Sequence, residues 1–124
     1  MDDINSFEYQ LSWGGGRYIL FIDFKEKHLQ KRWVHYKHGK HGPKNLNKEI
    51  ILSDAHILLL KECISKLTQA DAKPEPSGMP SMCASTIKII RSSSTLTLEI
   101  PSEPYTENSK AVLRSAENIL PSHS

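Results

Sequence analysis

The chain has 124 residues, of which 38% are hydrophobic, 24% charged and 7% aromatic. This composition excludes a wholly disordered chain, and the length excludes a large catalytic α/β enzyme. Two cysteines are too few for a disulfide scaffold, and no apolar run approaches the roughly 20 residues that span a bilayer. The acidic, polar N-terminus is unlike a signal peptide. We therefore expect an intracellular protein with reduced thiols and no membrane partner.

The net charge of +2 conceals an uneven distribution. Residues 17–48 contain nine basic and two acidic side chains, a net charge of +7, whereas the rest of the chain carries −5. Such a basic segment attracts a polyanionic partner, which here means either a nucleic acid or an acidic protein surface. A solvated, lysine-rich sheet face explains the same charges without any partner.

The first half of the chain predicts four strands followed by one helix. Alternating or continuous apolar residues predict strands over 7–13, 17–25, 29–37 and 48–52. Glycines 14–16 form a turn, and the Gly-, Pro- and Asn-rich stretch 38–47 is a loop. Ser53 is a suitable N-cap, and apolar residues at helical spacing extend to about Gln69. These elements predict an α+β fold, in which a curved, four-stranded antiparallel sheet is followed by a helix.

The second half of the chain predicts a linker and a smaller extension. Residues 70–85 contain three prolines and are typical of a linker. Beyond them the pattern predicts a hairpin from 86–90 and 95–100, and then a helix over 106–120. This hairpin either extends the sheet, caps a channel or recruits another protein. The expected divisions are a domain over 1–69, the linker over 70–85 and the extension over 86–124.

No sequence pattern indicates catalysis or metal binding. We find no nucleophile elbow, no paired acids at a motif spacing and no zinc pattern. Four histidines lie between His28 and His41, but no helix aligns them and no cysteine or carboxylate is placed to complete a ligand set. Cys63 lies on an apolar helix face and is expected to pack as a small core residue. We therefore expect neither an enzyme nor a metal or cofactor site.

Aromatic residues are interleaved with the basic residues of this segment. The rings are Tyr18, Phe21, Phe24, Trp33 and Tyr36. Phosphates pair with Lys and Arg while unpaired bases stack on aromatic rings, so such a surface prefers a single strand to a duplex. Alternatively, the rings fill the core. We favour the core for Tyr18 and Phe21, and leave both interpretations open for Phe24, Trp33 and Tyr36.

Short segments between 17 and 67 carry a family resemblance. They are Asp23–Lys27, Pro43–Lys44, Lys48–Ser53 and Leu60–Ser65. Their order and spacing resemble the positive cofactor four family, small transcriptional coactivators whose C-terminal domain binds single-stranded DNA. Glu26 and Glu49 stand where that family usually has glycine. The resemblance implies a nuclear homodimer whose curved sheets form channels for single strands, and it places Lys44 and Lys48 against phosphates and Tyr36 at a stacking position.

Taken together, these patterns predict a non-enzymatic, dimeric module that binds single-stranded DNA or RNA. The predicted binding residues are Phe24, Lys25, Lys27, Lys31, Arg32, Trp33, Tyr36, Lys44 and Lys48. The predicted dimer helix spans Ser53–Gln69, with contacts from Ile57, Leu60, Ile64 and Leu67. The runner-up is a protein-interaction module, such as a cytoplasmic immunity or inhibitor protein, whose basic face binds an acidic partner. A third interpretation, indicated by Glu26 and Glu49, is an adaptor that retains the fold without binding DNA.

Overall fold

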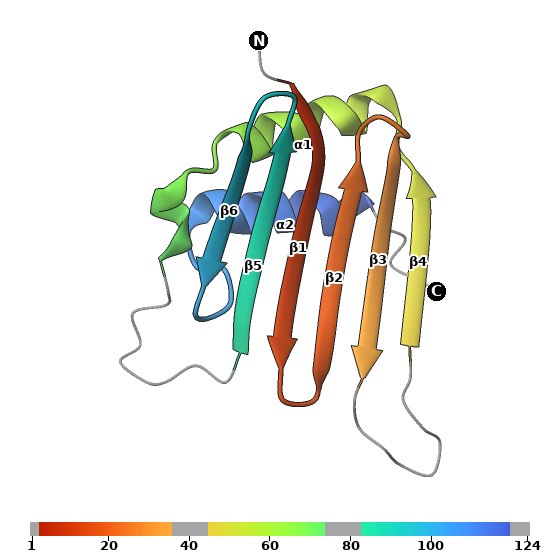
Figure 1. Ribbon diagram of the computed structural model, residues 1–124. Coiled ribbons are helices and arrows are strands. Elements are labelled where there is room, and N and C mark those ends of the chain that lie inside the picture. The colour runs from red at the N-terminus through yellow and green to blue at the C-terminus, as the bar shows by residue number, and fades with distance from the viewer. Residues whose placement is uncertain (1–2, 36–44, 74–82, 120–124) are drawn as a thin grey trace.

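A six-stranded antiparallel sheet organises the chain, and both long helices cross the same face of it (Figure 1). The computed structural model describes residues 3–35, 45–73 and 83–119. The strands are β1 (Ile4–Trp13), β2 (Gly16–Asp23), β3 (His28–His35), β4 (Asn45–Ile51), β5 (Cys83–Arg91) and β6 (Thr95–Ile100). The helices are α1 (Asp54–Ser65), the short 3-10 helix η1 (Gln69–Ala72) and α2 (Glu107–Ile119).

The strand order is β4-β3-β2-β1-β5-β6, and each neighbouring pair is antiparallel. The predicted α+β class and the plan of a sheet followed by a helix are confirmed. The sheet has six strands rather than four, because β5 pairs with β1 and β6 continues beyond it. The predicted C-terminal hairpin therefore extends the sheet, which is the first of the three alternatives considered for it.

The stretch predicted to be a linker, 70–85, is partly structured. Its first residues belong to η1, where the Thr68 hydroxyl accepts from the Ala70 N–H at 3.2 Å and the Asp71 carboxylate accepts from the Thr68 N–H at 2.8 Å. These reciprocal bonds cap the short helix. Its last residues belong to β5, and residues 74–82 lie outside the described ranges. Gln69 also donates a side-chain hydrogen bond of 3.2 Å to the carbonyl of Thr97, which joins η1 to β6.

The core lies between the sheet and the two helices. Alternation along β2 turns Tyr18, Leu20 and Ile22 toward the helices, and Phe24 follows them on the same side. All four are buried, which confirms the core interpretation for Tyr18 and decides between the two interpretations for Phe24. The most deeply buried side chains are Phe7, Leu20, Ile22, Leu29, Leu60, Ile64, Ile87, Ile89, Leu98, Ile100 and Val112. Each such aliphatic side chain stabilises the fold by about 1.5–3 kcal/mol relative to exposure.

The opposite face of the sheet is not covered by either helix (Figure 1). Consecutive residues of a strand point to opposite faces, so this face carries the residues that alternate with the core. On β2 and β3 it presents a strip of half-buried Ile19, Phe21 and Val34 beside exposed Arg17 and Arg32. We refer to these five residues as the outer patch. Ile19 and Phe21 explain why β2 has apolar residues on both faces, and the core position favoured for Phe21 from the sequence is wrong.

Candidate nucleic-acid interface

Four aromatic rings gather on the helix-covered face of the sheet. Tyr9 and Trp13 come from β1, Tyr18 from β2 and Trp33 from β3. The register places Trp33 opposite Tyr18, and their ring centroids are 5.2 Å apart at an interplanar angle of 77°. Trp13 and Trp33 are 6.2 Å apart, and Tyr9 and Tyr18 5.8 Å. With Leu113 these rings enclose most of a cavity of about 240 Å³, which we refer to as the aromatic groove.

The groove exists because the sheet extends past the helices toward the β1–β2 turn (Figure 1). Phe7 and Leu20 are fully buried, whereas Leu11, Trp13 and Trp33 are only half-buried. Of the helices, α2 borders the groove through Leu113 and Glu117, and the rings form the rest of its wall with Leu11. A cavity of about 150 Å³ is large enough for benzene. The aromatic groove therefore has room for one planar heterocycle.

One end of the groove is polar. The Tyr18 hydroxyl donates to Glu117 Oε1 at 2.5 Å, and Lys31 Nζ donates to both carboxylate oxygens, at 3.0 Å to Oε1 and 2.8 Å to Oε2. The same ammonium lies 5.2 Å from the Tyr18 ring centroid and 5.7 Å from that of Trp33. Cations are attracted to ring faces at such distances. The wall of the groove thus already holds one cation against aromatic rings.

Both tyrosines of the groove are held in their neutral form. Burial raises the pKa of Tyr18 well above its ordinary value, and the hydrogen bond and charge of Glu117 raise it further. Burial also raises the pKa of Tyr9, with smaller contributions from Glu103 and Cys83. Because Tyr18 remains protonated, its hydroxyl is a permanent donor to Glu117. Among the residues that line the groove, Glu117 is the one with a carboxylate side chain.

A second cation lies next to Lys31. Lys48 of β4 is its cross-strand partner and is half-buried. Side chains directly opposite one another on antiparallel strands are about 4.5–5.5 Å apart at Cβ. Within the described parts of the chain, Lys48 has no ion-pair partner, whereas Lys31 is neutralised by Glu117. Lys31 and Lys48 are therefore neighbours on the helix-covered face of β3 and β4, and within the described residues the ammonium of Lys48 is the one without an ion pair.

The predicted binding residues divide into separate groups. Lys31, Trp33 and Lys48 share the helix-covered face of β3 and β4. Arg32 is exposed on the opposite face, because it alternates with Lys31 and Trp33 along the strand. The side chains of Tyr36 and Lys44 lie outside the described residues.

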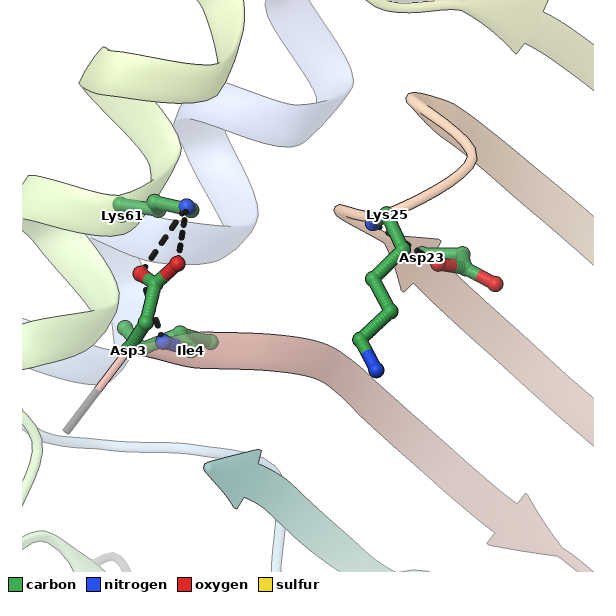
Figure 2. A network of polar contacts seen from close by, with 5 residues as sticks. All are labelled: Asp3, Ile4, Asp23, Lys25 and Lys61. Atoms are coloured by element: carbon green, nitrogen blue, oxygen red, sulfur yellow. Dashed lines mark hydrogen bonds and ion pairs between the residues drawn. The ribbon is translucent and has the colours of Figure 1, made fainter. Parts of the chain in front are cut away.

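The remaining predicted residues, Phe24, Lys25 and Lys27, lie in the β2–β3 turn, at the other end of β3 from Trp33 (Figure 1). Phe24 is 6% exposed, so the core interpretation, rather than base stacking, describes it. The ammonium of Lys61 lies 5.4 Å from its ring centroid and is held by both carboxylate oxygens of Asp3 (Figure 2).

The two lysines of the turn remain exposed. Asp23 Oδ1 accepts from the backbone N–H of Lys25 at 3.0 Å, and the Lys25 side chain extends away from the turn (Figure 2). Lys27 pairs with Asp54 at 3.2 Å and has a positive φ of 55°. Because this turn and the groove lie at opposite ends of β3, the lysines of the turn do not belong to one continuous site with Trp33.

The predicted dimer helix is largely occupied within its own chain. Leu60, Ile64 and Leu67 are buried in the core, and Ile57 is half-buried. Besides the sheet, α1 packs against α2, which brings Ser115 Oγ within 3.7 Å of Cys63 Sγ. The large apolar side chains of α1 that remain exposed are Leu58, at 71%, and Leu59, at 45%.

No protein-family model matches the chain, and no curated relative is found for it. Among the residues that the structure describes, no three metal-ligating side chains gather, and no helix is both long and apolar enough to cross a membrane. Sequence reasoning missed Trp13 and Glu117 as site residues. Trp13 lies on the same face of β1 as Tyr9, and the alternation of residues along this strand could have identified it. Glu117 had none, because it meets Tyr18 across 99 positions of sequence.

Proposed function

We propose that the protein is a non-catalytic module that binds a single nucleic-acid strand at the aromatic groove. The observation that carries the proposal is the placement of Trp33 beside Lys31 and Lys48, on a face with three further rings. An unpaired base enters the groove and stacks, while the adjoining phosphates contact the two ammonium groups. A duplex keeps its base faces covered and is a poor ligand. The proposed ligand is the single nucleic-acid strand that the sequence predicts, but the proposed site is smaller and consists of the aromatic groove with Lys31 and Lys48.

The resemblance to the positive cofactor four family supports the same ligand class. Strands β1–β4 are neighbours in the sheet in the order in which they occur in the chain, and α1 follows them directly. That order agrees with the four-strand-and-helix plan which the family resemblance implies. A role as a transcriptional coactivator in the nucleus follows from the resemblance alone and remains part of the proposal.

The first test compares strands and salt concentrations. Fluorescence anisotropy of a labelled 12-mer, as a single strand and as a hairpin duplex, is measured between 50 and 200 mM salt. We expect the single strand to bind more tightly. Two phosphate contacts predict a slope of about −1.4 in log K against log salt, since each contributes about 0.7 for a single strand. Equal affinity for the two forms, or a slope near zero, would contradict the proposal.

Substitutions then locate the site. Trp33→Leu keeps an apolar side chain but removes the stacking surface, so the dissociation constant should rise about 5- to 150-fold. Lys48→Ala should reduce the salt slope to about −0.7.

Arg32→Ala is the matched control, because it removes a cation from the same pair of strands on the opposite face. If Arg32→Ala weakens binding as much as Lys48→Ala does, the strand binds elsewhere. Urea unfolding of each variant confirms that the fold is retained.

A second function, the binding of an acidic protein, is favoured by the outer patch. On the uncovered face of the sheet, Arg17 lies opposite Val34 and Arg32 lies opposite Ile19, so the arginines alternate with the apolar side chains. Arginines interspersed with half-buried apolar side chains are suited to a protein surface with complementary charge. Under this alternative, Phe21→Ser and Arg32→Ala abolish co-purification of an acidic partner, while the wild-type chain does not retain oligonucleotides. Loss of oligonucleotide binding in Trp33→Leu would contradict it.

A further inference from the structure

Glu117 places a carboxylate at the end of the aromatic groove, where an inserted base would meet it. The residue extends from α2, lines the cavity with Leu113, and its side chain is 44% exposed. An ionised carboxylate only accepts hydrogen bonds. The edge of any base that reaches Glu117 is therefore selected for donors and against carbonyl oxygens.

The present partners of Glu117 occupy most of the hydrogen-bond acceptor positions of its carboxylate. A carboxylate has about four acceptor positions. Tyr18 occupies one on Oε1, and Lys31 occupies one on each oxygen. Tyr18 is buried and fixed by strand β2, but Lys31 has a flexible four-carbon side chain that is free to exchange one anion for another. When a phosphate takes Lys31, both oxygens of Glu117, a residue that lines the groove, regain an acceptor position.

We propose that these two positions read the inserted base and favour guanine, an inference that rests on the proposed function of the groove. Guanine presents N1–H and N2–H side by side on one edge, and the two match the two oxygens of a carboxylate. Cytosine and adenine each offer one amino group beside a ring nitrogen acceptor. Thymine and uracil offer N3–H between two carbonyls that face the carboxylate unfavourably. After the exchange the phosphate neutralises Lys31, and the charge of the Glu117 carboxylate is stabilised by hydrogen bonds from neutral donors, those of Tyr18 and guanine.

The test uses four labelled 11-mers of thymine with guanine, adenine, cytosine or thymine at the central position. Their dissociation constants are measured by anisotropy with the full-length protein at one low salt concentration. We expect the guanine strand to bind most tightly. One bidentate contact discriminates between bases by about 5- to 150-fold, and the expected preference over the all-thymine strand lies in this range.

Variants separate selection from simple affinity. Glu117→Gln replaces one acceptor oxygen by an NH₂ donor and keeps an acceptor for Tyr18, so it should remove the guanine preference. The all-thymine strand should bind this variant as tightly as the wild type, or more tightly, because Lys31 loses its internal partner. Glu107→Gln makes the same change at the other end of α2, where the side chain is exposed, and should leave the preference intact. Lys31→Ala should weaken all four strands by a similar factor.

The outcomes distinguish this inference from the proposed function. If all four strands bind equally, or if another base is preferred, base selection by Glu117 is wrong while single-strand binding stands. If the guanine preference survives in Glu117→Gln, another group reads the base and the inference is again overturned. If no strand binds at all, the proposed function fails, and the inference fails with it.

Discussion

At the scale of single residues, Tyr18 links the core to the candidate site. Its ring packs between those of Tyr9 and Trp33, and its hydroxyl donates to Glu117. One side chain therefore contributes both to stability and to the position of the carboxylate. The two contributions respond differently to substitution, because phenylalanine keeps the ring and loses the donor.

The raised pKa of Tyr18 predicts a loss of stability in alkali. Burial, and then Glu117, keeps the phenolic proton on the folded chain at a pH where the unfolded chain releases it. The stabilisation is complete below pH of about 10, the ordinary tyrosine pKa, and declines above it. Each tyrosine that stays protonated lowers the free energy of unfolding by up to about 1.4 kcal/mol per pH unit in that range. Tyr9 behaves in the same way.

Urea unfolding between pH 8 and 11 measures this effect. Tyr18→Phe should reduce the alkaline slope by roughly the contribution of one of the two tyrosines. Tyr105→Phe is the matched control, because Tyr105 is 42% exposed, and its removal should leave the slope unchanged. Equal slopes in wild type and Tyr18→Phe would show that Tyr18 is not protected from ionisation.

The β2–β3 turn supplies a second prediction at this scale. Lys27 has φ of 55°, and its carbonyl accepts from the Leu52 N–H at 2.7 Å. The left-handed conformation destabilises the folded chain by about 1–2 kcal/mol at a residue other than glycine. Glycine removes this cost but increases the conformational entropy of the unfolded chain, which lowers the free energy of unfolding by about 0.4–1 kcal/mol. Lys27→Gly should therefore raise the free energy of unfolding by up to about 1.6 kcal/mol. Glu26→Gly, at a residue without positive φ, should lower it by about 0.4–1 kcal/mol.

Chemical denaturation of the two glycine variants checks this opposite sign. The family resemblance places glycine at 26, whereas the backbone requires its freedom at 27. If Glu26→Gly stabilises the protein and Lys27→Gly destabilises it, the positive φ of the turn lies at residue 26 and not at residue 27.

At the scale of elements, local patterns predicted most of the strands and helices. The alternation of 7–13, the N-cap at Ser53 and the spacing of Leu60 and Ile64 all correspond to observed features; the Ser53 hydroxyl accepts from the His56 N–H at 3.2 Å. The pairing of β5 with β1 was not predicted, because their partners are about eighty positions apart and alternation does not identify a neighbour.

The candidate site was only partly predictable for the same reason. Lys31, Trp33 and Lys48 share one face, as the period of two along β3 and the β3–β4 register require. The other half of the groove comes from β1 and α2, which meet β3 only through the tertiary fold. Base stacking was left open for Phe24 because it lies beside lysines in the sequence. In the structure, Lys61 of α1 covers its ring. Sequence neighbours of a ring do not determine its exposure.

At the scale of the whole molecule, association of two copies remains a proposal, with a different contact from the one predicted. The buried residues of α1 serve its own core, so a dimer through this helix would use Leu58 and Leu59. Sedimentation velocity over a range of concentrations should show a second species that Leu58→Lys removes. Ala55→Lys, also exposed on α1, is the control. A single species of monomer mass at high concentration would contradict the proposal.

The bond from Gln69 to Thr97 has a consequence for the outermost strands. It takes up a main-chain acceptor on β6, and η1 lies against that strand, whereas β4 is the outermost strand on the other side. Unlimited growth by strand addition needs two unpaired edge strands on every molecule. A strand added at β6 would first have to displace the Gln69 side chain from the Thr97 carbonyl, so β4 is the edge at which strand addition costs less.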